Sequence, residues 1–148
     1  MTETSDFSLQ LSLINHYQFL VDFGEMGQLH TDEPEPLGLG DGPNPSRLLA
    51  AAVANCLAAS LLFAIRKFKE DPGSLTVKVS GQMVRQNARL RIGSIKVSLQ
   101  LGNASEAIPH LQRALAQFED FCVVTQSVQQ GIPVSVEVHD ANGLVHRS

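Results

Sequence analysis

Residues 44–69 read NPSRLLAAAVANCLAASLLFAIRKFK, and this stretch decides the fold. Asn44 can cap the first free N–H groups of a helix, and Pro45 suits the first helical position because its φ angle is preset. The helix is expected to run to about Lys69, before Asp71-Pro72-Gly73 ends it. A central helix is therefore predicted over residues 44–70.

Residues 48–65 of this helix carry no charge, which is near the lower length for a membrane span. Seven of these eighteen residues are alanine, which contributes little to insertion, and amphipathic strands flank the segment, so we expect no membrane partner. A helix that is apolar all round must be covered by protein on every side. One sheet can cover one side, and the simplest cover for the other is a second subunit.

Strands are predicted on both sides of the helix from apolar and polar alternation. The first two runs are Phe7, Leu9, Leu11, Leu13 and then, after a break at residues 14–16, Tyr17, Phe19, Val21, Phe23. Residues 31–43 hold three prolines and three glycines, which predicts a long ordered loop or a linker. Residues 1–43 therefore form N-terminal strands and a Gly/Pro loop.

Residues 74–138 are expected to hold a β-hairpin, a helical region and a closing strand. The hairpin turns at residues 86–88, and the apolar phase changes across Gly93-Ser94, which predicts a β-bulge. Helical spacing continues from Ile108 to Cys122, and a closing strand with one apolar face is predicted over residues 132–138. Residues 140–148 are left as a polar tail. This order predicts one α+β domain over residues 1–148, with antiparallel sheets.

Composition places the chain among globular domains, since 43% of its residues are hydrophobic and 18% charged. A formal net charge of -4 argues against a nucleic-acid partner. The eleven basic residues all follow Ser46, whereas residues 1–46 hold eight acidic ones. The two halves could attract each other, or the acidic part could be a solvated face.

The N-terminus lacks the features of a secretory signal, so a cytoplasmic protein is expected. In a reducing compartment two cysteines are too few for a disulfide framework, which leaves Cys56 and Cys122 either as inert buried side chains or as working thiols. Neither cysteine nor histidine spacing predicts a metal site.

The ordered set of segments resembles the OsmC-like family, which includes the organic hydroperoxide resistance proteins. The matching segments are DEPEPLGLGDGPNP before LLAAAVANC, the paired strands LTVKVSGQMVR and LRIGSIKVSLQL, and FCVVTQSVQQGIPVSVEV. The resemblance implies an intertwined homodimer with its long helices buried back to back. It also implies that Cys56 reduces an organic hydroperoxide and Cys122 resolves it, with no bound cofactor and with electrons from an external dithiol such as dihydrolipoamide.

The chain departs from this family at the groups that activate the first cysteine. Active members use an arginine from the N-terminal strands, held by a glutamate at the start of the long helix. Here no arginine precedes Arg47, and Ser46 and Arg47 follow Pro45. Arg47 and Cys56 lie nine residues apart, on opposite faces of one helix, so Arg47 could serve only across a dimer, or could instead pair with an acidic loop such as Asp32-Glu33.

The thiols themselves allow two hypotheses. Two nearby thiols suffice for peroxide reduction, because one forms a sulfenic acid and the other condenses with it. The apolar neighbours of Cys56 would keep it unreactive, while free N–H groups favour a Cys122 thiolate and Glu119-Asp120 oppose it. The leading hypothesis is a thiol-dependent reductase for organic hydroperoxides or related hydrophobic electrophiles. The alternative keeps the fold but binds a small hydrophobic molecule at the dimer interface without catalysis.

Overall fold

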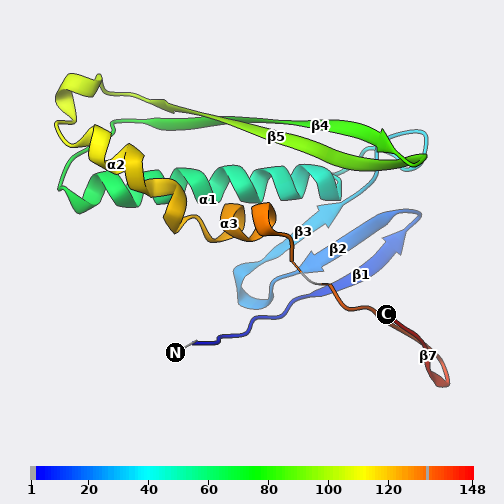
Figure 1. The fold of residues 1–148 in the computed structure, drawn as a ribbon. Coiled ribbons are helices and arrows are strands. Elements are labelled where there is room, and N and C mark those ends of the chain that lie inside the picture. Colours follow the sequence, from blue (N-terminus) through cyan, green and yellow to red (C-terminus); the bar gives the residue numbers. More distant parts are fainter. Residues whose placement is uncertain (1–2, 133) are drawn as a thin grey trace. The chain divides into compact units, whose positions relative to one another are not determined.

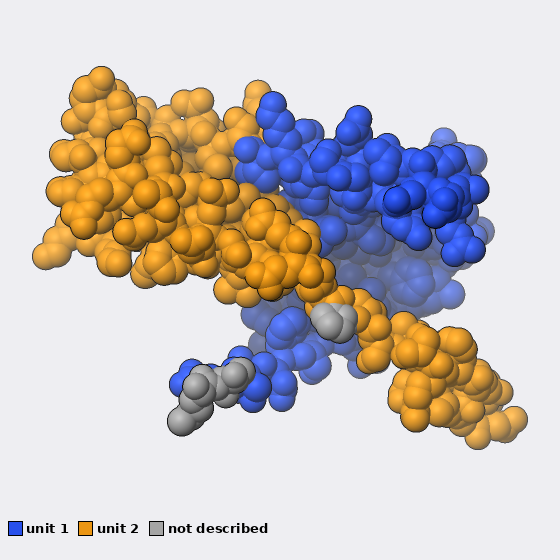
Figure 2. All heavy atoms as spheres, in the orientation of Figure 1, with its two compact units in different colours: residues 1–52, 79–97 blue, residues 53–78, 98–148 orange. Residues whose placement is uncertain are grey.

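The computed structural model describes residues 3–132 and 134–148. The chain divides into two compact units, shown in different colours in Figure 2. Unit 1 comprises residues 1–52 and 79–97, and unit 2 comprises residues 53–78 and 98–148. Helices and antiparallel strands occur together, which confirms the predicted α+β class (Figure 1).

Unit 1 begins with an antiparallel sheet in the order β1-β2-β3. Its strands are β1 (Gln10–Asn15), β2 (Gln18–Asp22) and β3 (Gln28–Thr31), with the 3-10 helix η1 (Gly24–Met26) before the last. The register pairs Leu11 with Val21 and shifts near Asn15, at the predicted break. The sequence did not predict β3, because four residues are too few to establish an alternation.

The central helix α1 (Pro45–Lys67) begins where the sequence predicts and ends two residues before Lys69. Asn44 caps it, since its side-chain Oδ1 accepts a hydrogen bond from the Arg47 N–H at 3.0 Å. Arg66 and Lys67 in the last turn complement the partial negative charge at the helix C-terminus.

The strands β4 (Leu75–Gln86) and β5 (Arg89–Leu101) form the predicted hairpin beside α1 (Figure 1). Asn87 and Ala88 both have positive φ angles, as a two-residue turn with the twist of its strands requires. Along β5 the half-buried positions step from Ile92 to Ile95 and then alternate. The predicted change of phase across Gly93-Ser94 is therefore confirmed in the burial pattern.

The hydrophobic core of unit 2 joins the second half of α1 to the predicted helical region. Ile108 and the helix α2 (Leu111–Gln117) pack on α1, and Leu99, Leu101 and Phe118 flank the contact. The buried members are Leu61, Ala64, Ile65, Ile108, Leu111 and Ala114. Small alanines on both helices allow α1 and α2 to approach closely.

The region predicted as one second helix is divided into short helices. It comprises η2 (Ser105–Ala107), α2, η3 (Phe118–Phe121) and α3 (Val123–Gln130). Cys122 interrupts the helical course because its backbone is extended, with φ -82° and ψ 95°. Cys122 is the N-cap residue of α3.

The predicted closing strand over residues 132–138 is wrong for residues 134–136, and Pro133 lies outside the described residues. The strands are instead β6 (Glu137–Asp140) and β7 (Gly143–Arg147), so the predicted polar tail forms half of a hairpin. Asn142-Gly143, a strong hairpin signal, explains the difference. The hairpin continues through a pair of hydrogen bonds between Val136 and Ser148.

Candidate functional site

Cys56 lies on α1 at the edge of a cavity within unit 2. The cavity has a volume of about 370 Å³, and Cys56 is half-buried beside it. Ser60 and Phe63 follow Cys56 on the same face of α1, and Phe121 enters from η3. The rings of Phe63 and Phe121 meet edge to face with their centroids 5.9 Å apart. Cys56 therefore stands at an apolar, partly aromatic entrance.

Cys122 lies in the same unit and is completely buried, with 0% of its surface exposed. Its sulfur is 2.9 Å from Thr125 Oγ1, and Cys56 is near enough to lower its pKa. Both cysteines are free thiols. Cys56 and Cys122 are sixty-six positions apart in the sequence and belong to the same unit, where Cys56 lines a cavity and Cys122 is enclosed.

The surroundings of Cys122 favour its thiolate. Burial raises the pKa of this thiol, but hydrogen bonds from the Thr125 hydroxyl, from Cys56, from the Thr125 N–H and from Ser60 outweigh burial, so the pKa lies below its ordinary value of 9.0. The acidic neighbours Glu119 and Asp120 are not among these causes. The Cys122 thiol therefore ionises more readily than its buried position alone would predict.

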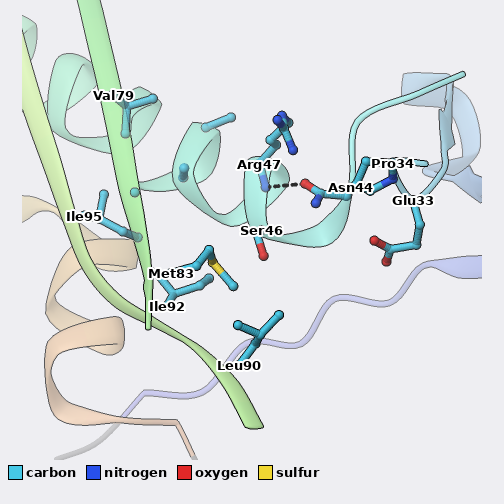
Figure 3. A pocket seen from close by; sticks show the side chains of 13 residues that line it. Glu33, Pro34, Asn44, Ser46, Arg47, Val79, Met83, Leu90, Ile92 and Ile95 are labelled. Atoms are coloured by element: carbon cyan, nitrogen blue, oxygen red, sulfur yellow. Dashed lines mark hydrogen bonds between the residues drawn. The ribbon is translucent and has the colours of Figure 1, made fainter. Parts of the chain in front are cut away.

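A second and larger cavity, of about 700 Å³, lies within unit 1 between the start of α1 and the hairpin (Figure 3). One wall is apolar and comes from β4 and β5, and the other end is polar. Figure 3 shows Ser46 pointing toward the side of Met83 and Ile92, while the Arg47 side chain points the opposite way. The labelled lining residues are Glu33, Pro34, Asn44, Ser46, Arg47, Val79, Met83, Leu90, Ile92 and Ile95.

Arg47 lines the cavity of unit 1, and neither cysteine is among the residues of that cavity. Among the described residues no ion pair joins Arg47 to Asp32 or Glu33, although Glu33 lines the same cavity. The action of Arg47 on Cys56 across a dimer stays a prediction.

Asp32 organises the Gly/Pro loop that borders this larger cavity. Asp32 is 2% exposed. Its carboxylate accepts hydrogen bonds from the backbone N–H groups of Glu33 at 2.7 Å, Asp41 at 3.0 Å and Leu39 at 3.2 Å. The Asp41 N–H lowers the pKa of Asp32 most, burial opposes it, and the other two N–H groups add to the lowering. Gly38 is required here, because a side chain would overlap the Glu33 carbonyl. The predicted long loop is therefore an ordered one.

Asp32→Asn is expected to lower the free energy of unfolding at neutral pH, because an amide N–H would face backbone N–H donors. The folded-state pKa of Asp32 lies below 3.8, so its contribution is present above 3.8 and is lost as the pH falls through the lower folded value. Urea unfolding at several pH values should show the two proteins converging in acid. Asp41→Asn is the control, because it keeps an acceptor for Gln18 Nε2, and its free energy of unfolding should change little. A stability difference between Asp32→Asn and the unchanged protein that persists in acid would contradict this account.

Several residues of the site were not singled out by the sequence. Ser60 interrupts the apolar run of α1 four residues after Cys56, and Thr125 follows Cys122 by three residues, at the first turn of α3. Residues three or four positions apart on a helix are neighbours, so both spacings place a hydroxyl near the preceding cysteine. This spacing is the signal by which the sequence could have predicted Ser60 and Thr125. Phe63 and Phe121 carry no signal that distinguishes them from core residues, since both fit an apolar helical repeat.

Solved structures with the same fold define the class of protein. A hydroperoxide resistance protein OsmC from Legionella pneumophila has a TM-score of 0.66 and 13% identity, covering 85% of this chain and 92% of its own. An organic hydroperoxide resistance protein from Elizabethkingia anophelis has a TM-score of 0.62 and 18% identity, covering 89% and 95%. An OsmC-like protein from Vibrio cholerae has a TM-score of 0.70 and 14% identity, covering 85% and 95%. At these identities the likeness establishes the fold.

The family model described as OsmC-like protein matches residues 38–137. The chain therefore belongs to the OsmC-like family, which confirms the resemblance drawn from its sequence. None of the curated proteins matches it.

The helix α1 is long and apolar enough to cross a membrane by length and composition alone. Of its most apolar window, 39% is buried in the single chain, and its second half forms the core of unit 2.

Proposed function

We propose that this protein reduces organic hydroperoxides, or related hydrophobic electrophiles, by a cycle of its two cysteines. The observation that carries the proposal is that Cys56 lines a cavity in the unit that encloses Cys122, and is near enough to lower the pKa of that second thiol. Cys56 is the attacking thiol because a substrate can reach it. Cys122 is the resolving thiol because it is enclosed and yet adjacent to the first sulfur.

The first step is attack of the Cys56 thiolate on the terminal peroxide oxygen. An S–O bond forms, the O–O bond breaks, and the departing alkoxide takes up a proton to give an alcohol. The Cys122 thiolate then attacks the sulfenic sulfur of Cys56, so that a disulfide forms and hydroxide leaves as water once protonated. The thiols are oxidised by two electrons and the peroxide is reduced by two.

An external dithiol completes the cycle. One of its sulfurs attacks the Cys56–Cys122 disulfide and its second sulfur displaces the protein, which releases two protein thiols and a cyclic disulfide. A compact dithiol such as dihydrolipoamide fits this step, because the disulfide would be approached through the cavity at Cys56. No resident cofactor enters the cycle.

The activating arginine and glutamate of active relatives have no counterpart at the positions where the family has them. Ser46 and Arg47 follow Pro45, and Arg47 lines the cavity of unit 1. The two buried hydroxyls of Ser60 and Thr125 are instead the polar groups that adjoin the thiols. In the proposed cycle, hydroxyl groups therefore take the place of the charged groups beside the thiols.

A homodimer in the cytoplasm is part of the proposal. The single chain exposes large apolar side chains that a monomer would not leave in water, and they occur on strands and helices alike. Prominent examples are Phe7, Leu13, Phe63, Val123 and Val134. A second copy of the chain, as the family resemblance implies, would cover them and enclose the cavity at Cys56. A reducing compartment keeps both thiols free between cycles.

The test is a titration of the pure reduced protein with one equivalent of cumene hydroperoxide. We expect both alkylatable thiols to disappear within seconds, and peptide mass spectrometry to find Cys56 joined to Cys122. A chain that retains both thiols under a large excess of the hydroperoxide would refute the proposed reaction.

A second candidate function is the binding of a small hydrophobic molecule without catalysis. The cavity of unit 1 favours it, because about 700 Å³ is enough for a ligand of ordinary size and its strand wall is apolar. Ser46 and Asn44 at the other end can form hydrogen bonds with one polar group of the ligand. The thiols would then be structural.

This candidate predicts that N-phenylnaphthylamine, a neutral fluorescent probe, binds and fluoresces in the cavity. Met83→Lys should weaken its binding roughly tenfold or more, because the ligand would have to desolvate a charge. Val84→Lys is the matched control, since Val84 neighbours Met83 on β4 and packs toward Gly93 and not into the cavity. Equal loss in both variants would count against binding at this site.

A further inference from the structure

The enclosed sulfur of Cys122 has buried hydroxyl groups from two helices in its surroundings. Thr125 on α3 places its Oγ1 2.9 Å from the sulfur, and Ser60 on α1 is among the groups that lower the pKa of the thiol. Both side chains are buried. The Thr125 N–H contributes to the same lowering of the pKa.

Buried hydroxyls have a specific use beside a thiol. A hydroxyl can accept from the S–H group of the thiol and can donate to the thiolate once the proton leaves. A hydrogen bond donated to the charged thiolate is stronger than one to the neutral thiol, and this favours the ionised form. An inert core cysteine has no need of two such neighbours, because apolar side chains fill the same space without desolvating hydroxyls.

Ser60 also adjoins the other sulfur. It follows Cys56 by four residues on α1 and lines the same cavity, and it also lowers the pKa of Cys122. A sulfenic acid on Cys56 would carry its hydroxyl group into this neighbourhood. Ser60 is therefore suited to hydrogen-bond the group that leaves when the disulfide forms.

We propose that Thr125 and Ser60 are positioning residues that hold Cys122 as the nucleophile of the disulfide-forming step. The inference rests on the proposed two-thiol function and adds the groups that make its second step efficient. In that step the Cys122 thiolate attacks the Cys56 sulfur, an S–S bond forms, the bond from Cys56 to its leaving group breaks, and the leaving group takes the electron pair. With a sulfenic acid the leaving group is hydroxide, which becomes water.

The step can be isolated by using Ellman's reagent in place of a peroxide. The half-buried Cys56, which lines the cavity, reacts first and becomes a mixed disulfide with thionitrobenzoate. The attack of Cys122 then releases a second, coloured thionitrobenzoate. The rate of that second release measures the proposed step directly. It is recorded against pH for the full chain, for Thr125→Val and for Thr125→Ser.

Thr125→Val removes the hydroxyl and keeps the shape of the side chain. We expect the second release to slow roughly threefold to tenfold at neutral pH, because a smaller thiolate fraction is partly offset by a stronger nucleophile. Its pH profile should move upward by about one unit or more. Thr125→Ser should restore both rate and profile, which a purely structural role of the threonine methyl group would not do.

An unchanged rate and pH profile in Thr125→Val would overturn the inference. If that variant fails to fold, Ser60→Ala decides, with slower second release supporting the proposal and an unaltered rate overturning it. The hydroperoxide titration tests the proposed substrate and not the role of the two hydroxyls. A chain that ignores cumene hydroperoxide but shows the hydroxyl-dependent second release would disprove the proposed substrate while retaining this role of Thr125 and Ser60.

Discussion

Cys56→Ser is expected to abolish the reaction with organic hydroperoxides. A serine hydroxyl is not ionised near neutral pH and does not form a stable product with peroxide oxygen, so the rate of peroxide consumption should fall by roughly a hundredfold or more. Stopped-flow mixing of the reduced protein with cumene hydroperoxide, followed by a colorimetric assay of remaining peroxide, measures this rate. Cys122 alone cannot replace the lost thiol, because it is fully enclosed.

Cys122→Ser is the matched variant, and its expected behaviour differs. Cys56 should still consume one equivalent of hydroperoxide, but the sulfenic acid has no partner thiol and should be trapped by dimedone or oxidised further. Turnover with a dithiol should then decline as sulfinic acid accumulates. If the two variants lose peroxide consumption to the same extent in the first turnover, the assignment of attacking and resolving roles is wrong.

The central helix could be predicted closely because its signals are local. Asn44 and Pro45 fix the start through a side-chain hydrogen bond and a preset φ angle, and both act within one turn. The hairpin turn at Asn87-Ala88 is local as well. Each of these features is decided by residues a few positions apart, so no knowledge of the remaining chain is needed.

The C-terminal strands were misplaced because two local signals competed. Val134, Val136 and Val138 alternate with polar residues, which favours a strand, but alternation does not tell which segment supplies the hydrogen-bonding partner. Asn142-Gly143 pairs Glu137–Asp140 with Gly143–Arg147 and determines the observed strands. Turn chemistry thus decided the register, and the polar character of the tail was misleading.

The proximity of the two thiols was beyond any local signal. The resemblance to a family implied it, whereas hydropathy placed Cys56 only among apolar neighbours. Their meeting depends on the core that joins α1 to α2, because α2 leads through η3 to Cys122. The position of the Thr125 hydroxyl depends on the extended backbone of Cys122, which precedes the first turn of α3. In that turn the third residue after Cys122 places its hydroxyl close to the sulfur.

This dependence of the site on the core leads to the second large effect. Leu61→Ala is expected to lower the free energy of unfolding by about 2–5 kcal/mol, because Leu61 is 2% exposed and its removal leaves a cavity where α1 packs on Ile108 and α2. Urea unfolding followed by circular dichroism measures the change. Leu115→Ala on α2 is the matched control, since Leu115 is 39% exposed and should cost a good deal less.

Leu61→Ala should also slow disulfide formation while Cys56 remains reactive. Leu61 belongs to the core of unit 2, which fixes α2 and therefore the segment that carries Cys122. A looser core would leave the two sulfurs less often within bonding distance, so first-turnover peroxide loss should persist while the mixed-disulfide release slows. A variant that is destabilised as expected yet forms the disulfide at the full rate would show that Cys122 is held by Thr125 and Ser60 without help from the core.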